Sequence, residues 1–307
     1  MNNEELRQLE ESISKIQDRA QRQLAQMYYE LLIDLKNRIS TIYEQHAING
    51  VVPREVWHTQ NYIEELEVYL TESINAITPV QFEVMKEALI EVYEESYYRE
   101  SFSINKGIGF GVAMYGLLKL KDIQKHVFNP LDSKRWTTRH RANNKYVSHE
   151  ILKIIKHGIK NGYAYDKVAK LITEKMDIAK GKAIKITNTE TARMQTTAQY
   201  ESMKVASEKG VEMQKQWVST LDGKTRDAHQ KLDGTVVGLD DYFMIDGAKA
   251  KCPHQFGEAE HDINCRCRVI SRIANIPLSV RISRETDGER GELIEYTDFK
   301  SWRKDLK

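Results

Sequence analysis

The sequence has few residues that could cross-link a fold or interrupt a helix. It contains three cysteines and five prolines among 307 residues. An odd, small number of cysteines gives no disulfide framework, so a reducing compartment or a metal site is the expected setting of these thiols. The longest apolar run, residues 107–118, is shorter than the ~20 residues of a membrane-spanning helix. The first five residues lack the basic and apolar parts of a secretory signal, and we expect no membrane partner.

Charged residues are abundant, and they are distributed unevenly. The chain is 30% charged and 40% hydrophobic, which is typical of a folded globular protein and excludes a disordered one. Residues 1–100 carry 19 acidic and 9 basic side chains, whereas residues 121–160 carry 10 basic and 3 acidic ones. This split indicates two surfaces for different partners, with the basic one suited to nucleic acid. A solvated basic helix face is the alternative interpretation.

Helical periodicity predominates in the first two thirds of the chain. Apolar residues at three- and four-residue spacing predict one long helix, or two abutting ones, over residues 4–48. Two further helices are expected over residues 54–76 and 80–103, separated around Pro79. Each of these helices has an apolar stripe, so a helical core is expected.

The helical pattern continues as far as Gly210. Residues 136–180 are helical in pattern, with a first helix closed by Gly158 and Asn161-Gly162. Residues 184–209 predict a further helix that Gly210 stops. In this last helix Glu190 and Arg193 lie one turn apart. We expect a local ion pair there rather than a catalytic role for Glu190.

Glycines, Asp-Gly pairs and short alternating runs replace helical periodicity after Gly210. Residues 213–220 and 266–273 alternate as strands do, and residues 221–223 and 232–234 have the composition of hairpin turns. The expected fold class is therefore α+β, with mainly helical N-terminal two thirds and a small β-containing C-terminal domain.

We expect four regions along the chain. The first is a helical region for partner docking or coiled-coil formation, the second is helical, the third is small, β-rich and Cys/His-containing, and the fourth is a tail. Their expected bounds are residues 1–120, 121–210, 211–276 and 277–307.

All three cysteines lie among histidines in the third region, and this clustering predicts a zinc site. Cys265 and Cys267 are two residues apart, which places both thiols on one face of a strand. Structural zinc takes four nitrogen or sulfur ligands. The expected set is His229, Cys252, Cys265 and Cys267, with His254 or His261 as substitutes. The spacing is not the paired CxxC of a zinc ribbon, so a few buried thiols and surface histidines are the alternative.

Two groups of basic side chains are candidate nucleic-acid contacts. Lys153, Lys156 and Lys160 recur on the exposed side of a predicted helix. Arg266 and Arg268 point away from the cysteines on a predicted strand, where they could contact phosphate or protect a strand edge from pairing.

Four sequence pieces occur in a characteristic order. They are Thr189-Glu190-Thr191-Ala192-Arg193; Trp217 followed by Asp222, Thr225-Arg226 and His229; Leu232-Asp233-Gly234; and Asn264-Cys265-Arg266-Cys267. Together they resemble the phage Mu F-like minor head proteins, also called the phage head morphogenesis family. The resemblance covers about residues 136–273, and Cys252 and His254 are not part of the family pattern.

This resemblance implies a virion component of low copy number that lies inside the capsid and is assembled in the host cytoplasm. The implied partners are the phage portal protein, a major capsid or scaffold protein, and double-stranded DNA for packaging or ejection. No enzymatic activity is established for the family, so a non-enzymatic protein is expected.

Two alternatives stay open. One is a metal-dependent nuclease or hydrolase centred on His229, with Asp227 or Asp233 nominated as its base. The other is a nucleic-acid-binding module without a virion role.

Overall fold

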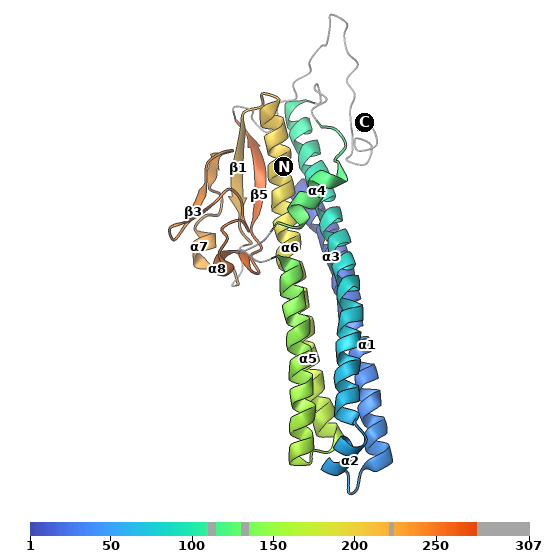
Figure 1. Ribbon diagram of the computed structural model, residues 1–307. Helices are drawn as coiled ribbons and strands as arrows, with labels where there is room; N and C mark the ends of the chain where they lie inside the picture. The colour runs from blue at the N-terminus through green and yellow to red at the C-terminus, as the bar shows by residue number, and fades with distance from the viewer. Residues whose placement is uncertain (110–114, 130–134, 221–223, 275–307) are drawn as a thin grey trace, which may run out of the picture. The chain divides into compact units, whose positions relative to one another are not determined.

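The computed structural model describes residues 1–109, 115–129, 135–220 and 224–274. Three long helices account for much of this part of the chain (Figure 1): α1 (Asn3–His46), α3 (Tyr62–Ile108) and α6 (Tyr165–Glu208). The other helices are α2 (Arg54–Thr59), α4 (Leu120–Val127), α5 (Trp136–Asn161), α7 (Asp227–Gln230) and α8 (Ala259–Asp262). The strands are β1 (Met213–Val218), β2 (Val236–Gly238), β3 (Phe243–Ile245), β4 (Ala248–Ala250) and β5 (Arg268–Ile273). None of the described helices is both long and apolar enough to cross a bilayer.

The chain divides into two compact units, each built from segments that are distant in sequence. Unit 1 comprises residues 1–17, 87–133 and 188–307, and unit 2 comprises residues 18–86 and 134–187. The four consecutive regions expected from the sequence divide the chain in a different way. The described part of the expected β-rich region lies wholly in unit 1, and the expected tail lies outside the described residues.

Unit 2 is a helical bundle with a mainly aliphatic core that also contains buried aromatic residues. The buried side chains come from α1, α2, α3, α5 and α6, and the three- and four-residue spacing seen in the sequence places one from each turn inward. Near the end of α1, the ring of Tyr43 packs edge-on against Trp57 of α2 at 6.0 Å. The core residues contributed by α1 are Tyr28, Leu31, Leu32, Leu35, Ile39, Ile42 and Tyr43.

Helix α3 runs without interruption through Pro79, so the expectation of two helices over residues 54–76 and 80–103 is wrong. Proline inside a helix removes one backbone hydrogen bond and costs about 3 kcal/mol. Ile74 and Met85 are buried on either side of the proline, and continuing the helix keeps both in the core. Packing on the two flanks therefore outweighs the local cost.

Helix α6 is likewise continuous where the sequence predicts one helix to end and another to begin, between residues 180 and 184. Ala179 and Ala183 in this stretch are fully buried, so tertiary packing holds the helix together across Gly181. The predicted end of α5 is confirmed, because Gly162 adopts a left-handed conformation with φ of 62° directly after Asn161.

A buried histidine gives unit 2 an acid-sensitive core. The ring of His140 is fully buried and packs edge-on against Phe82 and Trp136, with centroid distances of 6.4 and 6.2 Å. Neither ring nitrogen has a hydrogen-bond partner among the described residues. Burial, together with the charge of Arg139, lowers the pKa of His140 to about 4 from its usual 6.5.

We expect unit 2 to lose stability as the pH falls from 6.5 towards 4. In this window the unfolded chain binds a proton at residue 140 that the folded chain does not, so the free energy of unfolding falls by about 1.4 kcal/mol per pH unit. His140→Phe keeps an aromatic ring in the pocket and removes this contribution. Urea unfolding of both proteins at pH 7 and pH 5 measures it, and an equal loss of stability in the two would contradict the assignment.

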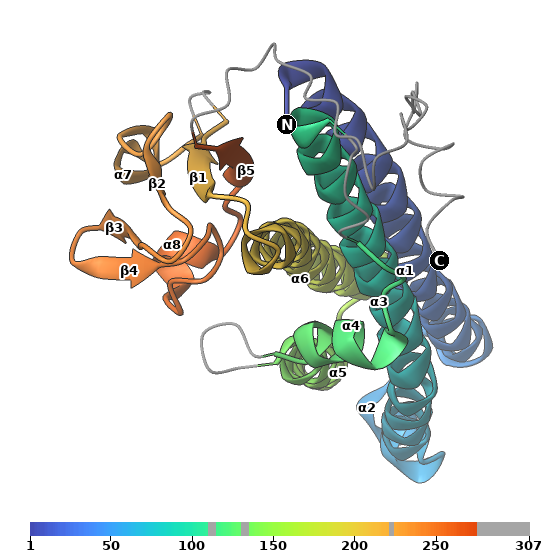
Figure 2. The same ribbon diagram turned by 90° about the horizontal axis from the view of Figure 1, so that it is seen from above.

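Unit 1 contains a three-stranded antiparallel sheet in the order β2-β1-β5 and a separate β3–β4 hairpin. Strand β1 alternates buried and half-buried residues, and the buried ones are Met213, Lys215 and Trp217. Figure 2 shows β5 beside the C-terminal part of α6. The Thr196 hydroxyl of α6 donates a hydrogen bond to the carbonyl of Pro253 at 3.1 Å, so small polar residues on this helix face permit close approach.

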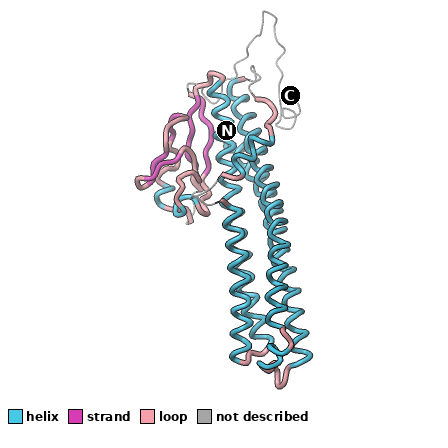
Figure 3. Tube along the Cα trace, in the orientation of Figure 1, coloured by secondary structure: helices cyan, strands magenta, loops and turns pink. Residues whose placement is uncertain are grey.

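The strands and the helices confirm the α+β class predicted from the sequence. All described strands fall between residues 213 and 273, shown in magenta in Figure 3, and helices form most of the chain before them. The two strands predicted over residues 213–220 and 266–273 are present as β1 and β5, which pair with each other over six residues. The predicted turn at residues 221–223 lies outside the described residues.

Candidate functional site

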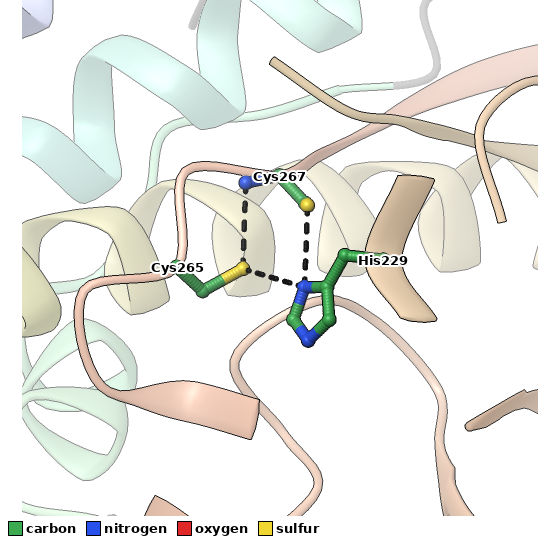
Figure 4. A group of neighbouring side chains, drawn as sticks. All are labelled: His229, Cys265 and Cys267. Atoms are coloured by element: carbon green, nitrogen blue, oxygen red, sulfur yellow. Dashed lines mark hydrogen bonds between the residues drawn. The ribbon is translucent and has the colours of Figure 1, made fainter. Parts of the chain in front are cut away.

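A buried group of one histidine and two cysteines lies in unit 1 (Figure 4). The Nδ1 atom of His229 is 3.5 Å from the Sγ atom of Cys265 and 3.5 Å from the Sγ atom of Cys267. The three atoms all lie within 4.8 Å of one another, and the three residues are 1, 5 and 1% exposed. The group therefore lies in the interior of the unit.

Local structure brings these side chains together. Cys265 and Cys267 precede β5, where the chain bends at Asn264 with φ of 55°, and the backbone N–H of Cys267 donates to the Cys265 sulfur at 3.4 Å. His229 is on α7, and its carbonyl accepts a hydrogen bond from the Ser219 hydroxyl at 2.7 Å. The Trp217 ring packs edge-on against the imidazole at 5.7 Å.

The two thiols differ in acidity. The hydrogen bond from the Cys265 thiol, with the contact to His229, lowers the pKa of Cys267 to about 5 despite its burial. The same hydrogen bond and burial raise the pKa of Cys265. A thiolate is the form that binds metal ions, and the lowered pKa of Cys267 favours it.

Three of the four predicted zinc ligands are brought together, and Cys252 lies outside their group. Cys252 is fully buried elsewhere in unit 1, and burial raises its pKa to about 12. His254 directs Nε2 at the Cys267 carbonyl, at 3.2 Å, and burial lowers its pKa to about 3. His261 belongs to a second group with Glu258 and Glu260. The four zinc ligands predicted from the sequence therefore do not all lie in one group.

The two aspartates nominated as a hydrolytic base do not join the His229 group. Asp233 accepts a hydrogen bond from the backbone N–H of Ser219 at 2.8 Å, and Asp227 is an exposed residue in the first turn of α7. Among the described residues, the group around His229 contains no carboxylate. The arrangement has the donor atoms of a metal site but no positioned general base.

The predicted nucleic-acid contacts fall in both units. On α5, Lys153 is 3.9 Å from Glu150 and Lys156 is 3.2 Å from Glu67, while Lys160 is exposed. The two paired lysines are exposed as well, so their charges face solvent. The α5 lysines therefore form an exposed row.

In unit 1 the two arginines of the predicted strand differ. Arg266 is exposed, whereas the Arg268 guanidinium donates to both carboxylate oxygens of Glu10, at 2.8 and 3.1 Å. Burial opposes ionisation of Glu10, but the charge and hydrogen bonds of Arg268 outweigh it and lower the pKa of Glu10. Arg268 is thus engaged inside unit 1.

The four pieces of the family pattern assemble in unit 1 through hydrogen bonds. The backbone N–H of Asn264 donates to the Thr189 hydroxyl at 3.3 Å, and the N–H of Gly234 donates to the Trp217 carbonyl at 2.9 Å. Glu190 and Arg193 form the predicted ion pair at 2.8 Å. Asp222 lies outside the described residues. The pattern therefore describes one packed unit.

Sequence reasoning missed several charged residues with long-range partners in this unit. Glu10 belongs to the predicted docking region yet pairs with Arg268, 258 residues away. Glu100 accepts hydrogen bonds from the Ser271 N–H at 3.2 Å and the Gln199 amide at 3.1 Å. The Lys215 ammonium donates to the Asp241 carbonyl at 2.7 Å. Helical or strand periodicity gives no signal for such long-range partners.

Comparison with known proteins agrees with the predicted family. Residues 149–270 match the family model described as phage Mu protein F like protein. The Minor head protein GP7 of Bacillus phage SPP1 is 27% identical over 305 residues, which cover 98% of this chain and 97% of that protein. The NAD(+)--arginine ADP-ribosyltransferase EFV of Enterococcus faecalis is 28% identical over 288 residues, 91% of this chain.

This chain spans only about half of the ADP-ribosyltransferase, since the alignment covers 56% of that relative. No solved structure gives a significant match. The family model and the near full-length similarity to a minor head protein confirm the family predicted from the sequence. Over residues 149–270 this chain is therefore similar to the phage Mu F-like family, and over nearly its full length it is similar to a minor head protein.

Proposed function

We propose that the protein is a structural component of a phage head that binds the portal protein inside the procapsid and contacts double-stranded DNA. The similarity to a minor head protein over 98% of this chain is the observation that carries the proposal. The alignment with that protein covers both units. We therefore propose that the helical unit 2 and the motif-bearing unit 1 act together in this role. The major capsid or scaffold protein is a further proposed partner.

The motif residues support a role in packing rather than in turnover. Glu190 is fully buried against Arg193, and Asp233 accepts a backbone hydrogen bond. A catalytic acid or base needs access to a substrate proton, which the buried Glu190 lacks, whereas the exposed Asp233 is already held by a backbone hydrogen bond. One relative is named as a transferase, but the alignment covers only 56% of that protein. We therefore propose no enzymatic activity for this chain.

Portal binding is proposed for the acidic N-terminal part of the chain. Residues 1–100 have ten more acidic than basic side chains, and many of these acids are exposed on α1 and α3. Complementary charge on a partner would speed association and fix its orientation. Co-expression with the portal protein, followed by affinity purification of the portal, tests this. Co-purification is expected, whereas recovery of portal rings free of this chain contradicts it.

We expect DNA binding to depend on salt through the α5 lysines. Each phosphate contact contributes about 0.9 to the slope of log affinity against log salt concentration. Replacing Lys153, Lys156 and Lys160 together by alanine should therefore lower the slope by up to about 2.7. Fluorescence anisotropy with duplex DNA at several salt concentrations measures it. The matched control is Lys15→Ala with Arg22→Ala on α1, which should leave the slope unchanged; equal effects of both variants would contradict the assignment.

A further inference from the structure

We propose that His229, Cys265 and Cys267 bind one Zn²⁺ ion that stabilises the fold of unit 1. Two sulfurs and one imidazole nitrogen form a donor set that zinc prefers. The inference does not depend on portal or DNA binding, because it rests on the interior of a single unit.

The distances between the donor atoms fit a tetrahedral ion. Zinc binds sulfur at about 2.3 Å and imidazole nitrogen at about 2.0–2.1 Å, which at tetrahedral angles separates a nitrogen from a sulfur ligand by about 3.6 Å. The Nδ1 atom of His229 lies 3.5 Å from each of the two sulfurs. The third pair, the two sulfurs, also falls within the 4.8 Å that encloses the group. The two nitrogen–sulfur distances are therefore those expected around a tetrahedral zinc ion.

Hydrogen bonding alone accounts poorly for this geometry. A neutral imidazole carries one ring proton, so Nδ1 can donate to at most one of the two sulfurs that it faces at equal distance. The other ring nitrogen, Nε2, is buried and has no hydrogen-bond partner among the described residues. A metal ion at Nδ1 would engage this nitrogen and both sulfurs at once, and the ring proton would then be on Nε2, which has no partner in the described chain.

The surroundings favour a closed, structural site. The backbone N–H of Cys267 donates to the Cys265 sulfur, a contact that stabilises a metal-bound thiolate. The ligands are at most 5% exposed, and no carboxylate lies in their group among the described residues. The fourth ligand is a solvent molecule or the His261 ring. The centroid of this ring is 5.9 Å from that of His229, and its buried Nδ1 atom has no hydrogen-bond partner in the described chain.

Elemental analysis of the full chain, purified under reducing conditions without chelator, tests the proposal. About one zinc per chain is expected, and His229→Ala, Cys265→Ser and Cys267→Ser should each abolish it. The matched control is Cys252→Ser, which replaces a fully buried cysteine outside the group and should retain zinc. Far-UV circular dichroism shows whether each variant has kept its helices.

Two further measurements keep the test decisive if a ligand variant fails to fold. Chelator should lower the thermal midpoint of the wild-type chain, and added Zn²⁺ should restore it. Replacement of zinc by Co²⁺ should give thiolate-to-metal charge-transfer absorption. If His261→Ala alters this spectrum, the fourth ligand is the His261 ring; if the spectrum is unchanged, the fourth ligand is solvent. A metal-free wild-type protein whose midpoint does not respond to Zn²⁺ overturns the proposal. Loss of zinc from a folded Cys252→Ser variant does so as well.

Discussion

Glu190→Ala is expected to destabilise unit 1 by about 3–5 kcal/mol, which is the usual cost of leaving a buried charge without its partner. The carboxylate is fully buried, and it accepts a hydrogen bond from the Arg193 guanidinium at 2.8 Å. The alanine variant leaves the buried guanidinium, 6% exposed, without a charged partner at residue 190, while its hydrogen bond to the His126 carbonyl at 3.0 Å remains. Urea unfolding followed by circular dichroism measures the loss.

The same helix provides a matched control for this variant. Asp177 and Lys180 form an ion pair with the same order and spacing on α6, but both side chains are exposed. Asp177→Ala should therefore change the free energy of unfolding by less than about 1 kcal/mol. Equal effects of the two alanine variants would show that burial does not govern the Glu190 pair.

Trp217→Ala is expected to cost about 3–5 kcal/mol, the range for removing a large aromatic side chain from a core. The indole is fully buried and packs edge-on against Phe243 at 5.2 Å and His229 at 5.7 Å. Its Nε1 atom donates to the Ser219 hydroxyl at 2.9 Å. The substitution thus removes the packing between β1, the β3–β4 hairpin and α7, and chemical denaturation reports its size.

Trp217→Phe separates ring packing from the hydrogen bond. It retains most of the apolar volume and loses only the donor to Ser219, so a clearly smaller loss of stability than for alanine is expected. If phenylalanine and alanine destabilise the protein equally, packing of the indole is not what holds this part of unit 1 together.

Local features of the sequence were sufficient for several elements. The alternation over residues 213–220 and 266–273 identified two strands. Strand β1 buries every second residue, as the alternation predicts, whereas β5 buries three consecutive residues, 269–271. The end of α5 followed from Gly162, which can adopt the left-handed conformation at no steric cost. The ion pair of Glu190 and Arg193 followed from their one-turn spacing.

Long-range packing decided the features that the sequence could not give. Pro79 and Gly181 both lie inside continuous helices, because burial of their neighbours outweighs the local preference for a break. Of the predicted ligands, Cys265 and Cys267 meet His229 because α7 packs beside the segment before β5, whereas Cys252 does not reach them. Spacing along the chain carries no information about such placement.

The presence of this chain in virus particles tests the central claim most directly. Co-expression with the portal and major capsid proteins, followed by mass spectrometry of purified procapsids, gives its copy number per particle. The account predicts a few copies per procapsid, protected from external protease until the shell is opened. Particles that form normally and contain no trace of the chain would contradict it.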